Sequence, residues 1–372
     1  MSSDFDRQPT IIDGAPDDIT LGTRVISPWE DDIGIRTFLE ERSGSRCEYY
    51  SAGKQALRDG LDILSANTVK TASNVVLPAY VPSALLEPIK DAGYEPRLYR
   101  ITEALRPDLT DVEAQLDGET LAVLSVNYFG FPQPDHGALI GHAADRDIPL
   151  IEDNAHSALS MTREGTLLGT RGDIGFTSFR KTIPVPNGAA LFIWRDGLRE
   201  GPFPRSGIRR RLTARDARFI AHRLTRAIGA HDSRSTHRNP GTKNSDTHRD
   251  LFGRDPRAVY EKTNEPMSRL SAVILDRLRP GTIVANKRRN YQDRLAAIRE
   301  VDGARPVFET LPEGTCPKAL PVIVEDVDEL ADALGTSPKS LPRWPPLPVE
   351  VTRNNRFSTS SFLAEHLIPL PV

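Results

Sequence analysis

Between residues 74 and 153, short apolar segments alternate with segments of helical spacing, and this alternation constrains the fold more than any other feature. Strands are predicted over 74–80, 96–101, 121–129 and 149–153, with helices over 82–92, 109–116 and 136–146 between them. The segment 121–129, LAVLSVNYF, is almost continuously apolar, as in strands that are covered on both faces. This pattern predicts an α/β fold whose large domain has three layers and a mostly parallel sheet.

Polar side chains gather where the predicted strands end. Asp153 and His156 follow the strand over 149–153. Two further apolar runs, 174–179 and 189–194, enclose an exposed turn that carries Ser178 and Lys181 and is braced by prolines. Because ligands of open α/β sheets bind at the carboxyl ends of the strands, these four side chains are expected to lie close together.

Two interpretations of Lys181 follow from the residues alone. A lysine in a braced turn at the end of a buried strand can form an imine with a carbonyl cofactor if its surroundings lower its pKa. Most loop lysines are instead solvated charges. The convergence with Asp153 favours the first interpretation, because a carboxylate at a buried strand end is costly to desolvate.

A helix is predicted to begin near Gly53, with apolar residues at helical spacing as far as residue 64 and Ser51 as its cap. A glycine at a helix N-terminus lets backbone N–H groups approach an anion, and Lys54 adds positive charge. An ordinary capped helix without a ligand is the alternative, since the segment lacks the spacing of a P-loop.

Composition excludes several classes of protein. The chain has 372 residues and a formal net charge of −3, and it carries no apolar run long enough to span a bilayer, so neither nucleic acid nor a membrane is expected as a partner. Its polar first residues and its two distant cysteines, Cys47 and Cys316, predict a cytoplasmic protein without disulfides. The basic region 202–257 includes a possible amphipathic helix over 213–228, but interleaved acidic residues favour a solvent-facing role over nucleic-acid binding.

Three parts are predicted along the chain. Residues 1–45 form a polar N-terminal segment, and 46–258 form the large domain, including a polar loop at about 230–255. Residues 259–372 form a helical linker, with helices over 266–278 and 284–298, and a smaller C-terminal α/β domain, in which 319–334 reads as a strand followed by a helix.

Taken together, these features resemble fold type I pyridoxal phosphate enzymes, and most of all the DegT/StrS-type sugar aminotransferases. The resemblance covers about 48–295. It is carried by SAGKQAL (51–57), VVLPAYVPSALLEPIKDAGYEP (75–96), SVNYFGFP (125–132), IPLIEDNAHS (148–157), GDIGFTSFRK (172–181), TNEPMSRLSAVILDRL (263–278) and KRRNYQDRL (287–295). The IPLIEDNAHS segment is the most specific match.

The resemblance implies a role for each matching position. Asp153 would pair with the pyridine nitrogen of pyridoxal phosphate, and His156 would stand near the ring hydroxyl. Lys181 would hold the cofactor covalently and transfer protons. The cofactor-binding positions would further include Gly53, Lys54, Gln55, Ser178 and, stacking on the ring, Tyr80. Asn264 would reach the phosphate of a neighbouring subunit, which implies a homodimer.

The resemblance also implies a function. It predicts an aminotransferase that moves an amino group from an amino-acid donor to a keto sugar, in particular a nucleotide-linked one. By strict spacing, however, the family's lysine position is Ile183, and the usual aromatic position is Pro82. Two alternatives therefore stay open: a catalytically inactive protein of this fold with a binding role, and a pyridoxal phosphate enzyme of changed reaction type.

Overall fold

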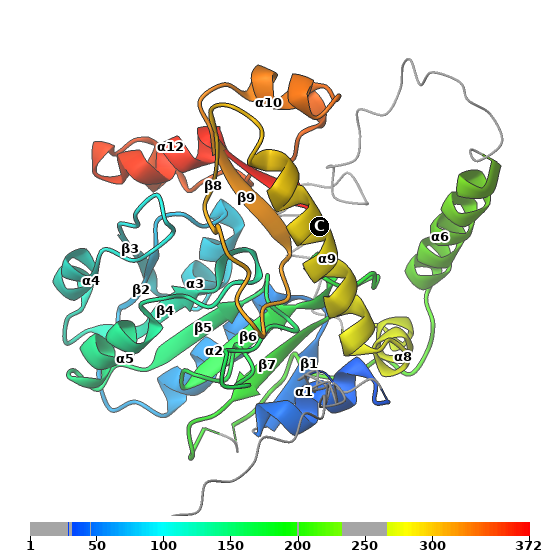
Figure 1. Cartoon of the computed structure of the whole chain (residues 1–372). Helices are drawn as coiled ribbons and strands as arrows, with labels where there is room; N and C mark the ends of the chain where they lie inside the picture. The colour runs from blue at the N-terminus through cyan, green and yellow to red at the C-terminus, as the bar shows by residue number, and fades with distance from the viewer. Residues whose placement is uncertain (1–28, 30–31, 45, 199–200, 233–265) are drawn as a thin grey trace, which may run out of the picture.

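A seven-stranded sheet forms the base of the molecule. The computed structural model describes residues 29, 32–44, 46–198, 201–232 and 266–372 (Figure 1). The strands of the large sheet are β1 (Arg46–Tyr50), β2 (Asn74–Pro78), β3 (Glu95–Tyr99), β4 (Thr120–Val126), β5 (Leu150–Asn154), β6 (Ile174–Ser178) and β7 (Ala189–Ile193). Their order is β1-β7-β6-β5-β4-β2-β3. The five strands from β3 to β6 run parallel, and β7 pairs antiparallel with both β6 and β1.

The α-helices connect and cover the strands. They are α1 (Ile35–Ser43), α2 (Gly53–Ala66), α3 (Leu86–Asp91), α4 (Leu109–Gln115), α5 (His136–Ala144), α6 (Ala214–Asp232), α8 (Arg269–Arg277), α9 (Pro280–Ile298), α10 (Val327–Ala333), α11 (Val349–Thr352) and α12 (Ser358–His366). Short 3-10 turns are η1 (Ser83–Leu85), η2 (Tyr128–Gly130), η3 (Phe179–Lys181), η4 (Pro338–Ser340) and η5 (Asn355–Phe357).

Helices lie on both faces of the large sheet. Gly60 of α2 approaches Ile174, which shares a face of β6 with Phe176. On the other face, His136 of α5 contacts Ser125 of β4, and Ser125 pairs with Glu152 of β5. The predicted mostly parallel sheet between two helical layers is therefore confirmed.

A second, three-stranded sheet is built from the C-terminal part of the chain and lies above the first in Figure 1. It contains β8 (Ala304–Pro306), β9 (Ala319–Val324) and β10 (Leu367–Pro371), all antiparallel, in the order β10-β9-β8. Buried residues of both sheets belong to one continuous apolar cluster, so the smaller sheet packs against the larger. This packing brings β9 next to the turn η2.

Several expectations need correction. The residues before α2 form the edge strand β1, and the helix begins after Ala52, which is its N-cap, rather than after Ser51. The Ser51 hydroxyl donates to Gln55 Oε1 (2.6 Å) instead of capping the backbone. The helix expected over 82–92 is divided into η1 and α3. The proline-rich C-terminal residues form β10, an edge strand, where prolines are tolerated.

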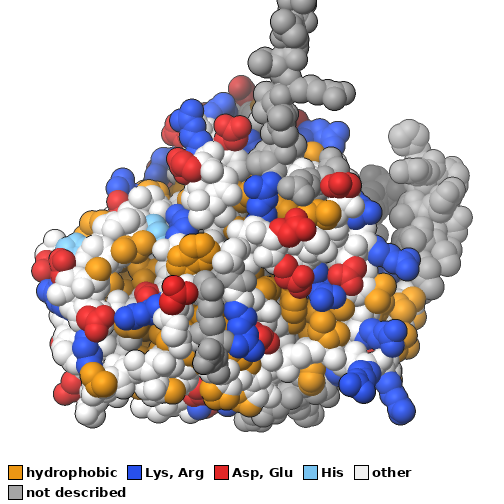
Figure 2. Space-filling view, turned by 90° about the horizontal axis from the view of Figure 1, so that it is seen from below, with side chains coloured by type: hydrophobic (Ala, Val, Ile, Leu, Met, Phe, Trp, Pro, Cys, Tyr) orange, Lys and Arg blue, Asp and Glu red, His pale blue; other side chains and the backbone are white. Residues whose placement is uncertain are grey.

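The basic region is described only in part. Its helix α6 stands beside α8 and apart from both sheets (Figure 1), while the polar loop at about 230–255 lies almost wholly outside the described residues. Figure 2 shows Lys, Arg, Asp and Glu side chains interspersed over most of one face of the molecule. No helix in the described ranges is long and apolar enough to cross a membrane.

Candidate active site

The turn that carries Lys181 is fixed at both ends by backbone hydrogen bonds. The Phe179 N–H donates to Gly188 O (3.0 Å), and the Thr182 N–H donates to Phe179 O (3.0 Å). Gly188 has a φ of +134°, a value that favours glycine. Lys181 ends the resulting 3-10 turn directly after β6. The sequence therefore holds this lysine at the carboxyl edge of the sheet, as predicted.

Lys181 and Asp153 line the same small cavity at this edge. The cavity measures about 20 Å³. Its walls come from the ends of β2, β4 and β5, from η3 and from the C-terminal region: Val81, Pro82, Val126, Asn127, Tyr128, Asp153, Ala155, His156, Lys181 and Trp344. Ile183 lies elsewhere, fully buried in an apolar cluster with Phe179 and Met267. Of the two positions that the sequence left in question, Lys181 is thus the one beside Asp153.

Asp153 is a buried carboxylate without an ion-pair partner among the described residues. Its Oδ1 accepts the Ala155 N–H at 2.9 Å. Burial raises the pKa of Asp153 above its ordinary value, while the positive charge of Lys181 and the Ala155 N–H partly oppose that shift. Such a carboxylate is suited to accept a hydrogen bond from a cationic group that enters the cavity.

Lys181 is solvent-exposed as a residue, and its amine faces both Asp153 and other cations. The protein around the amine lowers the pKa of Lys181, mainly by desolvation; Asp153 opposes this, and the positive Arg180 and Lys54 add to it. Water screens part of these effects because the residue is exposed. The lowered pKa nevertheless increases the fraction of Lys181 that carries a neutral amine, which is the nucleophilic form.

His156 is enclosed by aromatic rings. It stacks on Phe129 (centroids 5.7 Å apart) and meets Trp344 edge-on (5.7 Å). Its Nδ1 lies 3.4 Å from the Phe129 N–H, which donates to it. Burial, followed by the charges of Lys181 and Lys318, holds the pKa of His156 well below its usual range.

A neutral His156 predicts a measurable pH dependence of stability. Its folded pKa is depressed, so below the unfolded pKa of about 6.5 only the unfolded chain gains this proton. As the pH is lowered below that value, the free energy of unfolding should therefore decrease. This residue should contribute a decrease of up to about 1.4 kcal/mol per pH unit. Urea unfolding of the wild type and of His156→Gln at pH 7 and pH 5 measures it. A His156 resonance that titrates near pH 6.5 in the folded protein would contradict the expectation.

The predicted anion site lies where α2 meets the end of β6. A Cβ on Gly53 would lie 3.3 Å from Thr177 O, so glycine permits the close approach of the two elements. Ser178, also buried, is the last residue of β6. The first N–H groups of α2, including those of Gly53 and Lys54, have no partner within the helix. The Nε2 atom of Gln55 is buried with no hydrogen-bond partner among the described residues.

The structure does not confirm three other positions that are predicted to bind the cofactor, Lys54, Tyr80 and Asn264. The amine of Lys54 pairs with Glu87 (2.7 Å) and so does not point freely into the anion site. Tyr80 is fully buried and stacks on Trp344 (centroids 4.4 Å apart), whereas Pro82 lines the cavity. Asn264 lies outside the described residues.

Two functional candidates were missed from sequence, and both come from the C-terminal region. Trp344 closes the cavity against Tyr80, Tyr128, Phe129 and His156. Lys318, just before β9, donates its backbone N–H to Phe129 O (2.8 Å). A tryptophan and a lysine in a region without motif spacing carry no signal that links them to site residues so far earlier in the chain.

The turn that receives these residues is strained. Phe129 has a φ of +55°, which is uncommon for a residue with a Cβ, and Gly130 has a φ of +100°. A Cβ on Gly130 would lie 2.4 Å from Cys316 O, so glycine is required for the close approach of this turn to the segment before β9. The strained backbone of Phe129 thus lies where the C-terminal region contacts the candidate site.

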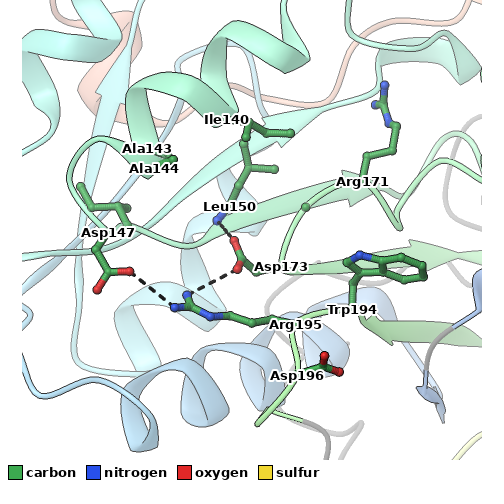
Figure 3. A pocket seen from close by; sticks show the side chains of 12 residues that line it. Ile140, Ala143, Ala144, Asp147, Leu150, Arg171, Asp173, Trp194, Arg195 and Asp196 are labelled. Atoms are coloured by element: carbon green, nitrogen blue, oxygen red, sulfur yellow. Dashed lines mark hydrogen bonds and ion pairs between the residues drawn. The ribbon is translucent and has the colours of Figure 1, made fainter.

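A larger cavity lies at the opposite end of the strands. It measures about 510 Å³ and is lined by residues such as Leu150, Asp173 and Trp194 (Figure 3). Arg195 lies there between Asp147 (3.5 Å) and Asp173 (3.4 Å). Its cation is thus already paired, and the cavity is at the amino ends of β5 and β6, away from Lys181. The candidate site remains at the carboxyl edge.

Part of the chain is similar to a known protein family. Residues 50–196 match the model of the DegT/DnrJ/EryC1/StrS aminotransferase family. No curated protein sequence matches the chain. Among solved structures, the chain is similar to the aminotransferase TlmJ from Streptoalloteichus hindustanus, with 21% identity, TM-score 0.59, and coverage of 92% of this chain and 86% of that one.

Two further solved structures share the fold. DesV from S. venezuelae, in complex with a ketimine intermediate, is 19% identical with a TM-score of 0.61, over 91% of this chain and 82% of that one. The GDP-4-keto-6-deoxymannose-3-dehydratase ColD is 16% identical with a TM-score of 0.56, over 91% of this chain and 89% of that one. At these identities the likeness shows a shared fold alone, and residues 50–196 are the part of the chain that is similar to the DegT/DnrJ/EryC1/StrS aminotransferase family.

Proposed function

We propose that this protein is a pyridoxal phosphate-dependent aminotransferase that acts on a keto sugar and takes the amino group from an amino-acid donor. The observation that carries the proposal is the placement of Lys181 beside the buried carboxylate of Asp153 in one cavity. The match to an aminotransferase family supports it.

The residues present fit the chemistry of pyridoxal phosphate at three points. The start of α2 offers backbone N–H groups and the unpartnered Nε2 of Gln55 to a phosphate. Asp153 offers a carboxylate to a pyridine nitrogen, and Lys181 offers an amine to an aldehyde. The volume of about 20 Å³ holds no more than about one water molecule, so the ring enters only if a wall of the cavity moves.

When bound, the cofactor supplies an electron sink and a carrier for the amino group. The protein's own residues would supply the rest. Asp153 would hold a proton at the pyridine nitrogen through its carboxylate. Lys181 Nζ would take the proton from the donor's Cα as general base and deliver it, as general acid, to the carbon that carries the cofactor's aldehyde. The neutral imidazole of His156 would stay beside the ring without adding charge. A homodimer completed by Asn264 is part of the proposal.

Reduction with borohydride tests the assignment of Lys181. We expect the protein loaded with pyridoxal phosphate to show the absorbance of a protonated imine, and borohydride to fix the cofactor to the peptide that contains Lys181. Peptide mapping by mass spectrometry identifies the modified lysine, and the Lys181→Ala variant is the control. Retention of both the absorbance and turnover in that variant would show that another residue holds the cofactor.

A non-catalytic protein of the same fold is the second candidate. It is favoured by the burial of Ile183 at the family's lysine position and by the small cavity closed by Trp344. A saturated protein that gives no covalent adduct on reduction would support it. A changed reaction, such as the dehydration performed by ColD, is less well supported, because such an enzyme typically carries a histidine as base and neither position 181 nor 183 is a histidine.

A further inference from the structure

We propose that Lys318 binds an acidic group of the substrate, a carboxylate or a phosphate, opposite Lys181. The proposal deepens the proposed function, because it assigns charge to the molecule that reacts at the same site. It depends on three observations: the position of Lys318, the charges that act on it, and the hydrogen bonds that the nearby Lys287 and Arg288 already make.

The backbone of Lys318 is fixed to the strained turn at the carboxyl edge. Its N–H donates to Phe129 O (2.8 Å), and its Nζ lies 5.9 Å from the centroid of the Phe129 ring. The same ring stacks on His156, which lines the cavity with Asp153. Lys318 therefore lies behind the ring that stacks on His156, close enough for its charge to act on His156 and for the charge of Lys181 to act on it.

The charges that act on Lys318 are positive, and the carboxylate of Asp153 lies nearer to Lys181. Burial, followed by the positive charges of Lys181 and Lys287, lowers the pKa of Lys318 to about 7. The neighbouring His156 is neutral, as its depressed pKa shows. No carboxylate in the described parts of the chain lies within ion-pair distance of Lys318. An acidic ligand would supply the missing negative charge.

The neighbouring cations are already bound to backbone oxygens. Lys287 Nζ donates to Val372 O (3.2 Å), and Arg288 donates to Pro312 O and Thr315 O (2.8 Å each). These bonds hold α9 and the segment before Cys316 in place. Lys318 has no such hydrogen bond among the described residues, so its amine is the group available to a ligand.

A specific signature follows from this arrangement. An anion next to Lys318 favours its charged form, so binding should be accompanied by uptake of a proton when the pH lies above about 7. Binding should also weaken as the pH rises further, because Lys318 must be protonated to bind the anion and its protonation costs more free energy at higher pH. An ordinary exposed lysine, which is charged at pH 8, would take up no proton.

Isothermal titration calorimetry of the full chain without cofactor tests the proposal. Succinate and pyrophosphate serve as separate probes, one for a donor carboxylate and one for a diphosphate-bearing acceptor. At pH 8, in two buffers of different ionisation enthalpy, we expect at least one probe to bind with uptake of up to one proton per chain. Lys318→Met should weaken that binding by about tenfold or more, as expected for loss of a charged hydrogen bond. Lys339→Met, at an exposed lysine of the same region, should leave it unchanged.

Two results would overturn the proposal: no binding of either probe to the wild type, or binding by Lys318→Met that equals the wild type. Replacing a partly desolvated lysine by methionine should keep or raise the melting temperature, and a melting curve shows whether the variant is folded. If Lys318→Met does not fold, Lys318→Gln is used in its place. Because the titration needs no cofactor, its outcome does not depend on whether Lys181 binds pyridoxal phosphate covalently. A failure of this proposal and a failure of the proposed function can therefore be distinguished.

Discussion

Lys181→Ala is expected to lower kcat/KM for transamination by about 10³-fold, because both covalent attachment and proton transfer would depend on its amine. Steady-state kinetics with an amino-acid donor and a keto sugar measures the loss. The Lys339→Ala variant, which removes an exposed lysine, should keep full activity.

Rescue by a small amine sharpens this test. If Lys181 acts through its amine, added methylamine should restore part of the turnover of Lys181→Ala, since a free base can take over the proton transfer. The binding of pyridoxal phosphate at the start of α2 should persist in the variant, because it rests on other residues. Wild-type turnover in Lys181→Ala without added amine would exclude the proposed role.

Asp153→Asn is expected to lower kcat by about 10²–10³-fold with little change in KM. The amide keeps the size of the side chain and removes the charge that would hold a proton at the pyridine nitrogen, an electrostatic contribution of the kind that costs this much when lost. Kinetics of the purified variant, with cofactor content measured by absorbance, separates weak loading from slow chemistry. An unchanged kcat at full loading would contradict the assignment.

The same variant should be more stable than the wild type at neutral pH. Burial raises the pKa of Asp153, so the folded protein binds this proton more tightly than the unfolded chain does. The buried charge therefore costs stability above the folded pKa, and the cost disappears below the unfolded pKa of about 3.9. We expect Asp153→Asn to gain on the order of 1 kcal/mol at pH 7 and nothing at pH 3, measured by urea unfolding. Loss of activity with gain of stability would separate a functional carboxylate from a structural one.

The larger part of the fold could be predicted from local patterns. The apolar segments before Asp153 and Ser178 are short and continuous, which indicates buried parallel strands, and their polar ends follow directly. Positions that depend on one hydrogen bond could not be predicted. Ser51 has the chemistry of a cap, yet its hydroxyl donates to Gln55, and the helix starts one residue later because β1 runs as far as Tyr50.

The two ends of the site were determined in different ways. The sequence by itself determined that Asp153, His156, Ser178 and Lys181 meet at one edge, because parallel strands align their carboxyl ends. It left open whether Lys181 or Ile183 faces Asp153, and the tertiary structure decided this by burying Ile183 in an apolar cluster with Phe179. Only the packing of the C-terminal region on the strained Phe129–Gly130 turn brings Trp344 into the cavity wall and Lys318 against the Phe129 ring. Contacts between segments so far apart depend on the packing of whole sheets, and local spacing in a chain carries no record of them.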